Sequence, residues 1–535
     1  MKLNQVFSAL LVAGVTTAPA ISFANDSTEL EALRDVVQQL EQKVKVLERK
    51  NEVTEEETVA AKKSAPVVKA SQNGFGIESA DGKNAIRFKG LLQADYRSFQ
   101  EGANDVRARS DARAGRLDND GFHDANDSGL LRRVRPTIEG TFLGKYDFRF
   151  TPELAGSSVS VVDAYIDARL NSAFKVRVGK YKPFVGLERL QSGADLKFIE
   201  RAYVTNAFLP NRDVGISVFG DLLDGKLSYA VGVNNGVVDG GNASASTEFD
   251  GSKEVTARLF ATPFKDELSA LSGLGFGVAV TTTNIDGEKN LNFTDTSAAD
   301  GSRNGLPSYL TEGQQAFFRY GGGVVADGRR TRIAPQAYYY NGPFGAIAEY
   351  TQVHQDVSKV TDGSPAGGGA AVNETLLSGT GRTLKHNGWD VGVSYLLTGE
   401  EASFKGVKPK QDFDLEKGGW GAWEIVARYS EINLDSATFK NANGAYGGEF
   451  GGSNTAAQAA GLAYSDLTKS AKAAQTWTLG VNWYLNANTK FQLNYLNTSF
   501  DGGASKDGNI ANATASNVKD RPNEQAIFGR LQVAF

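Results

Sequence analysis

Four basic side chains lie close together in one connecting segment of the sequence, residues 182–211. They are Lys182, Arg189, Lys197 and Arg201. Arginine stays charged and offers oxyanions a planar fork of N–H donors, whereas lysine acts as a flexible point charge. A connection of about thirty residues in a compact protein is usually functional or disordered. The chemistry that these residues indicate is reversible attraction of anions, in which no bond is made or broken.

Residues that could support covalent chemistry are sparse. The chain has no cysteine, which excludes disulfides and thiolate metal sites, and its histidines, His123, His354 and His386, are scattered. It contains no nucleophile elbow, zinc motif or phosphate-binding loop, and its Asn-Gly, Asp-Gly and Gly-Gly pairs are turn signals. A barrel hydrolase would need a serine beside His354 or His386, and the sequence shows no evident one. We expect no catalysis, cofactor or metal.

The segments on both sides of the loop predict two β-strands that hold it. Phe174, Val176 and Val178 alternate with polar or small neighbours before the loop, and Val214 and Ile216 do so after it. Strict alternation indicates a sheet whose two faces meet different environments. The pattern continues from about residue 85 to the end of the chain and predicts sixteen strands. They are expected at 85–99, 130–142, 145–153, 161–170, 174–181, 212–220, 226–236, 253–262, 272–284, 329–340, 344–355, 386–398, 420–433, 474–485, 489–500 and 524–535.

The connections between these strands mostly alternate between short and long, except that 399–419 is long where a short turn is expected. Short periplasmic turns and long external loops are typical of outer-membrane barrels. No mature segment has the roughly 20 consecutive apolar residues that a membrane helix needs. We therefore predict an all-β fold, a 16-stranded antiparallel transmembrane β-barrel over residues 74–535. Loop 182–211 is expected to fold into its lumen and form the narrowest point.

The N-terminal residues divide into three parts. Residues 1–24 combine a positive end, a short apolar run and small residues before Asn25, which is typical of a secretory signal peptide. Residues 25–50 carry Leu or Val at alternating spacings of three and four. This spacing predicts a short coiled coil that associates with copies of itself, or an amphipathic helix packed on its own barrel. Residues 51–73 lack periodicity and are predicted to be a linker.

The chain ends on an aromatic residue, Phe535, as bacterial outer-membrane proteins typically do. Aromatic side chains such as Trp423, Trp477 and Trp483 lie on the apolar phase near predicted strand ends, where an interfacial girdle would place them. The alternative is ordinary core packing in a soluble β-protein. That alternative leaves unexplained why one face of so many strands is polar and charged.

If the apolar phase faces lipid, the opposite phase lines the lumen and is mainly basic, although the chain has a net charge of -5. Rings of Arg and Lys select anions, and a narrow pore focuses their field. A one-residue register slip would turn a strand inside out, and the charges could instead pair with one another. The predicted basic lumen residues are Arg87, Lys89, Arg97, Arg133, Arg135, Arg149, Arg169, Lys175, Arg177, Lys226, Arg258, Arg330, Arg332, Arg428, Lys490 and Arg530.

Seven segments resemble the phosphate-selective porin family, that is, porins O and P and their relatives. They are LLRRVRPTIEGTF (130–142), VVDAYIDARL (161–170), VRVGKYKPFVGLERLQSGADLKFIER (176–201), NRDVGISVFGD (211–221), YLLTGEE (395–401), GAWEIVARYSEINLD (421–435) and GVNWYLNANTKFQLNYLNT (480–498). The resemblance implies trimeric sixteen-stranded barrels with an arginine ladder, an inward-folded third loop and a lysine cluster at the constriction. Segment 100–129 has no counterpart that we can map, and Lys359, Lys385, Lys405 and Lys408 are equal candidates for a downstream basic partner.

Residues carried over by motif are Arg132 and Arg133 in the ladder, Asp163 near the binding site, and Lys180, Lys182, Arg189 and Lys197 in or beside the third loop. The alternation places Arg133 inside and Arg132 near the rim. Together with the lumen and loop residues they give a predicted anion pathway. It comprises Arg87, Lys89, Arg132, Arg133, Arg135, Asp163, Lys175, Arg177, Lys180, Lys182, Arg189, Lys197 and Arg201.

We predict a homotrimeric porin in the outer membrane of a Gram-negative bacterium. It would let small anions, phosphate or polyphosphate among them, diffuse passively through a basic lumen. Its expected partners are lipid, the cargo anions, other copies of the chain, and peptidoglycan or another periplasmic component contacted by the coiled coil; nucleic acid is not expected. One alternative is a general, weakly selective diffusion porin. Another is an adhesin or structural anchor whose working part is the coiled coil.

Overall fold

The computed structural model describes residues 26–71, 74–100, 127–243, 250–287, 304–321, 323–361, 375–376, 379–448, 462–506 and 515–535. The chain divides into two compact units, residues 1–66 and 67–535. The predicted signal peptide and most of segment 100–129 lie outside the described residues.

The first unit contains one long helix, α1 (Asp26–Ser64). Its predicted seam is present, and every apolar member described is about half or more exposed: Leu30, Leu33, Val37, Leu40, Val44 and Leu47. A seam of this kind is buried only when helices associate, so association with other copies stays a prediction. None of the described helices combines the length and the apolar character needed to cross a membrane.

The prediction of a linker over residues 51–73 is wrong. Helix α1 continues to Ser64, and a strand, β1 (Val67–Ser71), follows it. Residues 51–64 are rich in Glu, Ala and Lys, which are strong helix formers, so helix propensity is enough where the apolar periodicity ends. An ion pair one turn apart, Arg49–Glu52 at 3.0 Å, also supports the helix where the linker was expected to begin.

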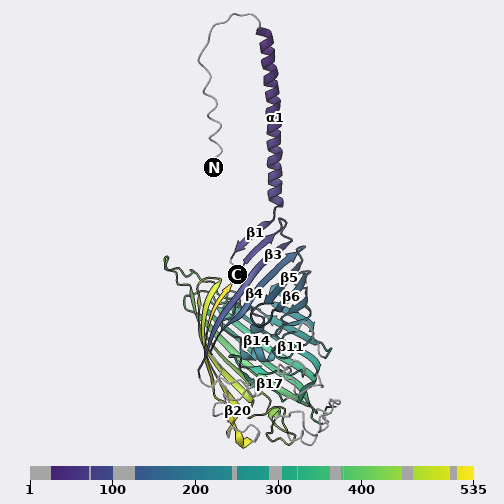
Figure 1. Cartoon of the computed structure of the whole chain (residues 1–535), viewed down its shortest axis with the longest axis vertical. Coiled ribbons are helices and arrows are strands. Elements are labelled where there is room, and N and C mark those ends of the chain that lie inside the picture. The colour runs from purple at the N-terminus through teal and green to yellow at the C-terminus, as the bar shows by residue number, and fades with distance from the viewer. Residues whose placement is uncertain are drawn as a thin grey trace. The chain divides into compact units, whose positions relative to one another are not determined.

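Sixteen antiparallel strands form one closed barrel in the second unit, because β22 pairs back with β3. In Figure 1 the yellow C-terminal strands lie beside the purple β3. All sixteen predicted strands are confirmed, with shifts of several residues at some ends. They are β3 (Ala85–Phe99), β4 (Ser128–Phe142), β5 (Tyr146–Glu153), β6 (Ser160–Arg169), β7 (Lys175–Tyr181), β8 (Asp213–Leu222), β9 (Leu227–Asn234), β10 (Glu254–Ala261), β11 (Leu274–Asp286), β14 (Val324–Asn341), β15 (Phe344–Thr361), β17 (Arg382–Leu396), β18 (Ala422–Asn433), β19 (Ala471–Tyr484), β20 (Thr489–Ser505) and β22 (Glu524–Ala534).

The barrel wall exposes its apolar side chains on the outer face and buries its polar side chains on the inner face, which is the reverse of a soluble protein. On β19, Trp477 and Leu479 are 59% and 54% exposed, whereas Thr476 and Thr478 are buried. The outward row continues across neighbouring strands, because Leu479 lies opposite Tyr495 of β20. Apolar-out and polar-in alternation is the pattern of a barrel in lipid. The soluble β-protein alternative is therefore wrong.

A hairpin of β1 and β2 (Gly74–Glu78) precedes the barrel strands. Strand β2 pairs with β3 over Ala85–Phe88 and β22 pairs with it over Leu91–Phe99, so both use one edge of β3. Phe535 stands at the junction: its N–H donates to the Gly90 carbonyl at 3.0 Å, and its ring lies 6.2 Å from that of Phe75. Residue 90 is glycine because a Cβ there would come 2.6 Å from the Phe535 ring.

Short turns join strands at one end of the barrel, the short-turn end, and mostly long connections join them at the other, the long-loop end. The connection 397–421 between β17 and β18 is long at the short-turn end, as the sequence predicts. Shorter elements lie in or beside the connections. They are α2 (Leu187–Leu190), α3 (Tyr203–Phe208), β12 (Tyr309–Leu310), β13 (Ala316–Phe318), β16 (Thr375–Leu376), β21 (Val518–Asp520), and the 3-10 turns η2 (Leu223–Gly225), η3 (Ala270–Gly273), η5 (Ser436–Phe439) and η6 (Ala515–Asn517).

Candidate solute pathway in the barrel lumen

The loop of residues 182–211 is fastened to the inner wall at its first helix, α2. The carboxylate of Glu349 on β15 accepts the backbone N–H groups of Leu187 and Glu188 at 2.6 and 2.9 Å. Helix α2 has no capping side chain of its own, so Glu349 supplies partners for N–H groups that a helix start leaves free. On β14, Gln336 donates to the Val185 carbonyl at 2.6 Å.

The second half of the loop is fastened to three further strands. The Ile199 N–H donates to Asn494 on β20 at 2.8 Å, and the Ile199 carbonyl accepts from Arg530 on β22 at 2.5 Å. The Tyr203 hydroxyl donates to the Ser430 carbonyl on β18 at 3.0 Å. These inward-facing partners belong to strands around much of the barrel. The loop therefore lies inside the lumen, as the sequence predicts.

Part of the lumen is filled by an apolar core. It is built from α3, the β12–β13 hairpin and residues that β11, β14, β15 and β17–β20 point inward. Five of its aromatic members are fully buried: Tyr203, Phe208, Tyr309, Phe317 and Phe318. This core lies on the side of the lumen formed by β11–β20.

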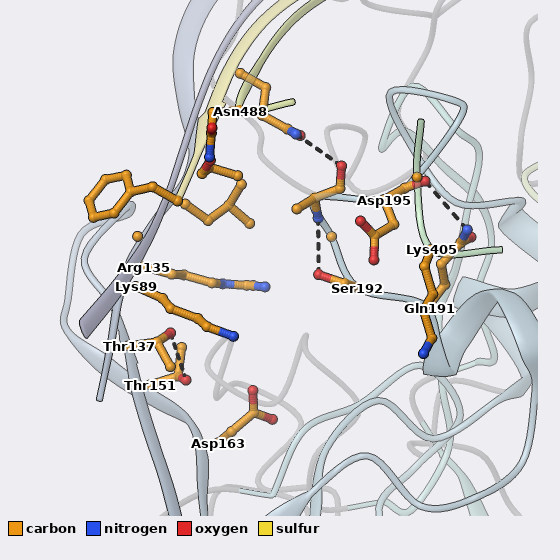
Figure 2. A pocket seen from close by; sticks show the side chains of 18 of the residues that line it. Lys89, Arg135, Thr137, Thr151, Asp163, Gln191, Ser192, Asp195, Lys405 and Asn488 are labelled. Carbon is orange, nitrogen blue, oxygen red and sulfur yellow. Dashed lines mark hydrogen bonds between the residues drawn. The ribbon is translucent and has the colours of Figure 1, made fainter. Parts of the chain in front are cut away.

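A polar cavity of about 750 Å³ lies between the loop and strands β3–β7. Lys89 and Arg135 reach into it from the wall, and Ser192 and Asp195 of the loop face them (Figure 2). Asn488, in the β19–β20 turn, places the cavity at the short-turn end. Its basic lining residues are Lys89, Arg135, Arg149, Arg177, Lys182, Arg212, Lys405 and Lys490, and its acidic ones are Asp163 and Asp195.

Several basic groups of the cavity are neutralised by carboxylates. Three of these carboxylates do not line the cavity themselves. Lys89 pairs with Glu139 at 2.6 Å and Arg135 with Glu153 at 2.6 Å. Arg177 pairs with Asp167 at 2.7 Å. Arg149 also pairs with Glu139, and Arg212 lies 3.4 Å from Asp163 in the lining itself. These pairs hold the guanidinium and ammonium groups in place and reduce their net field.

Three lysines of the cavity have no carboxylate oxygen within 4 Å in the part of the chain that the structure describes. Lys182 donates to the Gln191 carbonyl at 2.8 Å and Lys490 to the Leu196 carbonyl at 2.6 Å, whereas Lys405 has no such bond to a described residue. Burial and the charges of Arg201 and Arg212 lower the pKa of Lys182. A bound anion would stabilise the charged ammonium form and raise this pKa again. The cavity lysines therefore favour the binding of an anion.

Asp195 is the carboxylate on which all three lysines act. Their charges favour its ionised form, but burial is the larger effect and raises its pKa to about 6. Asp195 thus keeps its charge above pH 6 and loses it below, which leaves the lysines less compensated. We expect the anion preference of the channel to rise about fivefold between pH 8 and pH 5, because removing one nearby charge is worth about 1 kcal/mol in water. Reversal potentials at the two pH values measure it.

The matched control is Asp195→Asn, which removes the carboxyl group and keeps the shape. It should show the high anion preference at both pH values. An equal pH dependence in Asp195→Asn and in the unaltered chain would assign the effect to another group.

Comparison with known proteins identifies the family. The family described as phosphate-selective porin O and P matches residues 104–535. The chain belongs to this family. It is 22% identical to Porin O of Pseudomonas aeruginosa over 471 residues, which cover 82% of this chain and 88% of the relative. It is 24% identical over 466 residues to an uncharacterized protein of Caulobacter vibrioides, covering 80% and 83% of the two chains.

Solved structures similar to this porin include an outer-membrane channel. The channel DcaP of Acinetobacter baumannii matches with a TM-score of 0.46 and 12% identity, covering 86% of this chain and 99% of its own. OprB of Pseudomonas putida matches with a TM-score of 0.42 and 9% identity, covering 84% and 94%. The family and the closed barrel make this protein an outer-membrane porin of a Gram-negative bacterium.

Five of the thirteen residues predicted for the pathway of this porin line the cavity: Lys89, Arg135, Asp163, Arg177 and Lys182. The other eight do not line it.

The paired arginines of the predicted ladder are packed beneath the loop. A β-bulge between Gln93 and Ala94 of β3 shifts the register of β4, leaves Arg132 without a cross-strand partner and brings its side chain to Glu200 of the loop, at 2.5 Å. The prediction that Arg132 lies near the rim is therefore wrong. Arg133 faces inward as predicted, donates to Gln93 at 2.5 Å and is 3% exposed.

Three basic residues of the loop stabilise the loop itself. Arg189 donates to the Thr205 carbonyl at 2.6 Å, and Arg201 donates to the Gln191 carbonyl at 2.7 Å. Lys197 pairs with Glu424 of β18 at 2.5 Å. Their charged groups hold the fold of the loop of residues 182–211, so their contribution to the pathway is indirect.

The remaining three predicted residues lie at strand ends. Lys180 shares the outward face of β7 with Val178 and donates to the Ala243 carbonyl at 2.6 Å, so it does not face the lumen. Lys175 faces inward at the short-turn end and pairs with Asp221 at 2.9 Å. Arg87 is exposed where β2 meets β3.

Four basic residues of the cavity were not in the predicted pathway. Arg149 and Lys490 lie on the inward phase of β5 and β20, and the alternation of their strands had placed both in the lumen without assigning them to the pathway. Arg212 precedes β8 and Lys405 belongs to the connection 397–421. Neither has a periodic signal, because the folding of a connection brings it to the cavity. Of the four lysines considered as a downstream basic partner, Lys359, Lys385, Lys405 and Lys408, only Lys405 lines this cavity.

Proposed function

We propose that this porin lets small anions, phosphate and polyphosphate among them, diffuse passively through the cavity beside the loop of residues 182–211. The observation that carries the proposal is the set of cavity lysines, Lys182, Lys405 and Lys490, which have no carboxylate within 4 Å among the described residues. The paired residues Arg135 and Arg177 would add weaker sites along the wall. Several weak sites in series let an ion enter and leave, which conduction requires.

The family supports the choice of cargo. Its description names phosphate selectivity, and one similar protein is Porin O. Phosphate suits the lining because an oxyanion accepts hydrogen bonds from ammonium and guanidinium groups, and also from hydroxyls such as Ser192 at the edge of the cavity.

A general, weakly selective diffusion porin is the second candidate. The observation in its favour is that Lys89, Arg135 and Arg177 are each neutralised by a carboxylate. Charges that cancel in pairs give a hydrated wall with little preference for either ion sign.

The reversal potential of single channels in a planar bilayer under a KCl gradient separates the two candidates. We expect anion preference, and block of the chloride current when phosphate is added. Anion preference without block would leave an anion pore with another cargo. Equal permeability to both ions would establish the general porin, and no conductance from folded protein would contradict both.

We also propose that the porin is a homotrimer and that α1 associates with its copies in the periplasm. One similar solved structure is described as the trimer form of OmpT of Vibrio cholerae, and the exposed seam of α1 needs a partner. Sedimentation of the detergent-purified chain, with and without residues 26–64, measures the stoichiometry and the helix contribution. A monomer in both forms would contradict the proposal. Contact of α1 with peptidoglycan remains a prediction, which co-sedimentation of the full chain with purified sacculi would test.

A further inference from the structure

The two acidic side chains that line the cavity differ in their surroundings. Asp163 lies 3.4 Å from Arg212. The Asp195 carboxylate has neither a hydrogen bond nor a basic nitrogen within 4 Å among the residues that the structure describes, and it points into the cavity (Figure 2). A Cβ on Gly406, in the connection 397–421, would come 3.0 Å from Asp195 Oδ1, so glycine at this position keeps the carboxylate open. Asp195 is therefore a free hydrogen-bond acceptor in a cavity that attracts anions.

A free carboxylate in this place favours one class of anion over another. Its charge repels a small anion such as inorganic phosphate, whose own O–H group belongs to the repelled ion. An anion gains from Asp195 when it carries a hydrogen-bond donor several bonds away from its charge. That donor is a neutral one, because Lys182, Lys405 and Lys490 act on the same carboxylate and would repel an ammonium group. A hydroxyl group meets both conditions.

The rest of the lining suits a hydroxylated solute. The cavity volume of about 750 Å³ falls in the range of small-molecule sites, about 300–1,000 Å³. It is far more than a phosphate ion needs, since one water molecule takes up about 30 Å³. The space between the charged groups is bordered by neutral hydrogen-bonding side chains, namely those of Thr137, Thr151, Gln191, Asn486, Asn488 and Gln532.

We propose that the preferred solutes of this cavity are phosphorylated sugars and polyols, whose phosphate group lies among the cavity lysines while a hydroxyl group donates to Asp195. The inference rests on the proposed passage of anions and narrows the class of cargo. Both parts of such a solute find their partners close together. Lys182 and Asp195 belong to the loop of residues 182–211, Lys405 to the connection 397–421 and Lys490 to β20, and the three segments converge on the cavity.

Block of the chloride current in a planar bilayer at pH 8 tests the proposal, with glucose 6-phosphate compared against inorganic phosphate. At this pH Asp195 is ionised, because its pKa is about 6. Both solutes then carry mostly two negative charges, since the second pKa of a phosphate monoester is also about 6. We expect glucose 6-phosphate to half-block the current at a concentration about tenfold lower, which is the factor that one hydrogen bond to a charged group supplies. Glucose without phosphate should not block at that concentration.

Asp195→Ala separates the hydrogen bond from the charge. The half-blocking concentration of glucose 6-phosphate should rise several-fold because the hydroxyl loses its acceptor. That of inorganic phosphate should fall because a repelling charge is gone. Asp195→Asn, which keeps an oxygen acceptor without the charge, should lie between the two. Glu401→Ala removes an exposed carboxylate from the connection 397–421 and should change neither value.

Equal block by the two solutes in the unaltered chain would overturn the proposal. A shift in the same direction for both solutes in Asp195→Ala would do so too, and would leave Asp195 as an electrostatic group in an anion porin. Reversal potentials under a KCl gradient report the proposed function separately, because they need no phosphorylated solute. If the channels lack anion preference, isothermal titration of the detergent-purified chain with the same two solutes decides. Tighter binding of glucose 6-phosphate would support the site, and equal binding would overturn it.

Discussion

Replacing Lys182 with glutamate is expected to lower the ratio of chloride to potassium permeability by about tenfold or more. The Lys182 ammonium faces the cavity and donates to the Gln191 carbonyl at 2.8 Å. The substitution changes the local charge by up to two units, and each is worth about 1 kcal/mol to an ion about 4 Å away in water. Since about 1.4 kcal/mol corresponds to a factor of ten, the effect is large. Reversal potentials under a KCl gradient measure it.

The matched control is Lys506→Glu, which makes the same change at an exposed lysine at the long-loop end, after β20. It should leave the permeability ratio unchanged, and Lys182→Arg should keep it near its original value. If Lys182→Glu and Lys506→Glu shifted the ratio equally, net protein charge would explain the selectivity and the cavity would not.

Removing the Glu200 carboxylate is expected to destabilise the barrel and release the loop of residues 182–211 from the wall. Glu200 is buried and pairs with Arg132 of β4 at 2.5 Å and Arg97 of β3 at 2.6 Å. Glu200→Ala leaves two guanidinium groups without this partner, and removing one member of a buried ion pair typically costs about 3–5 kcal/mol. We expect the free energy of unfolding in urea to fall by about that amount. Single-channel conductance should rise because the loop loses its tie to β3 and β4.

Glu401→Ala serves as the control, because Glu401 is an exposed carboxylate in the connection 397–421. It should change neither quantity. A Glu200→Ala protein with reduced stability but unchanged conductance would show that the remaining contacts, such as that of Ile199 with Asn494, hold the loop by themselves.

The barrel could be predicted from the sequence because alternation is a local property of each strand. Thr476, Trp477, Thr478 and Leu479 point in alternating directions whatever their neighbours are. The inward position of the loop was predicted from its length and its basic residues, but a loop of this length can also lie over the mouth of a barrel. Its contacts with the inner wall, such as that of Leu187 with Glu349, confirm the inward position. The continuation of α1 from residue 51 to Ser64 was missed, because this segment has high helix propensity but no apolar periodicity from which a helix is usually predicted.

The membership of the cavity could be predicted only in part. Strand phase gave Lys89, Arg135 and Arg177 correctly, but it cannot tell a side chain that faces open space from one that another segment covers. Arg133 faces inward and is nevertheless buried, because Gly193 of the loop lies over it: a Cβ on Gly193 would come 3.4 Å from the Arg133 side chain. Lys405 reaches the cavity from a connection more than two hundred residues beyond Lys182. Contacts of this kind depend on the whole fold.

Phe535 is held in place at the seam between β22, β2 and β3, although 45% of its surface is exposed. Strand β2 begins on the edge of β3 where β22 stops, and Phe75 packs against the ring of Phe535. A peptide added after Phe535 would have to leave the sheet at that junction. A C-terminal affinity tag would therefore lie where the β1–β2 hairpin pairs with β3. The same closeness of residues 74 and 535 makes the barrel nearly a closed ring of chain. A short linker between residues 535 and 74 would therefore allow a circular permutation of the barrel. New termini could be placed in another connection, and every strand would keep its present neighbours.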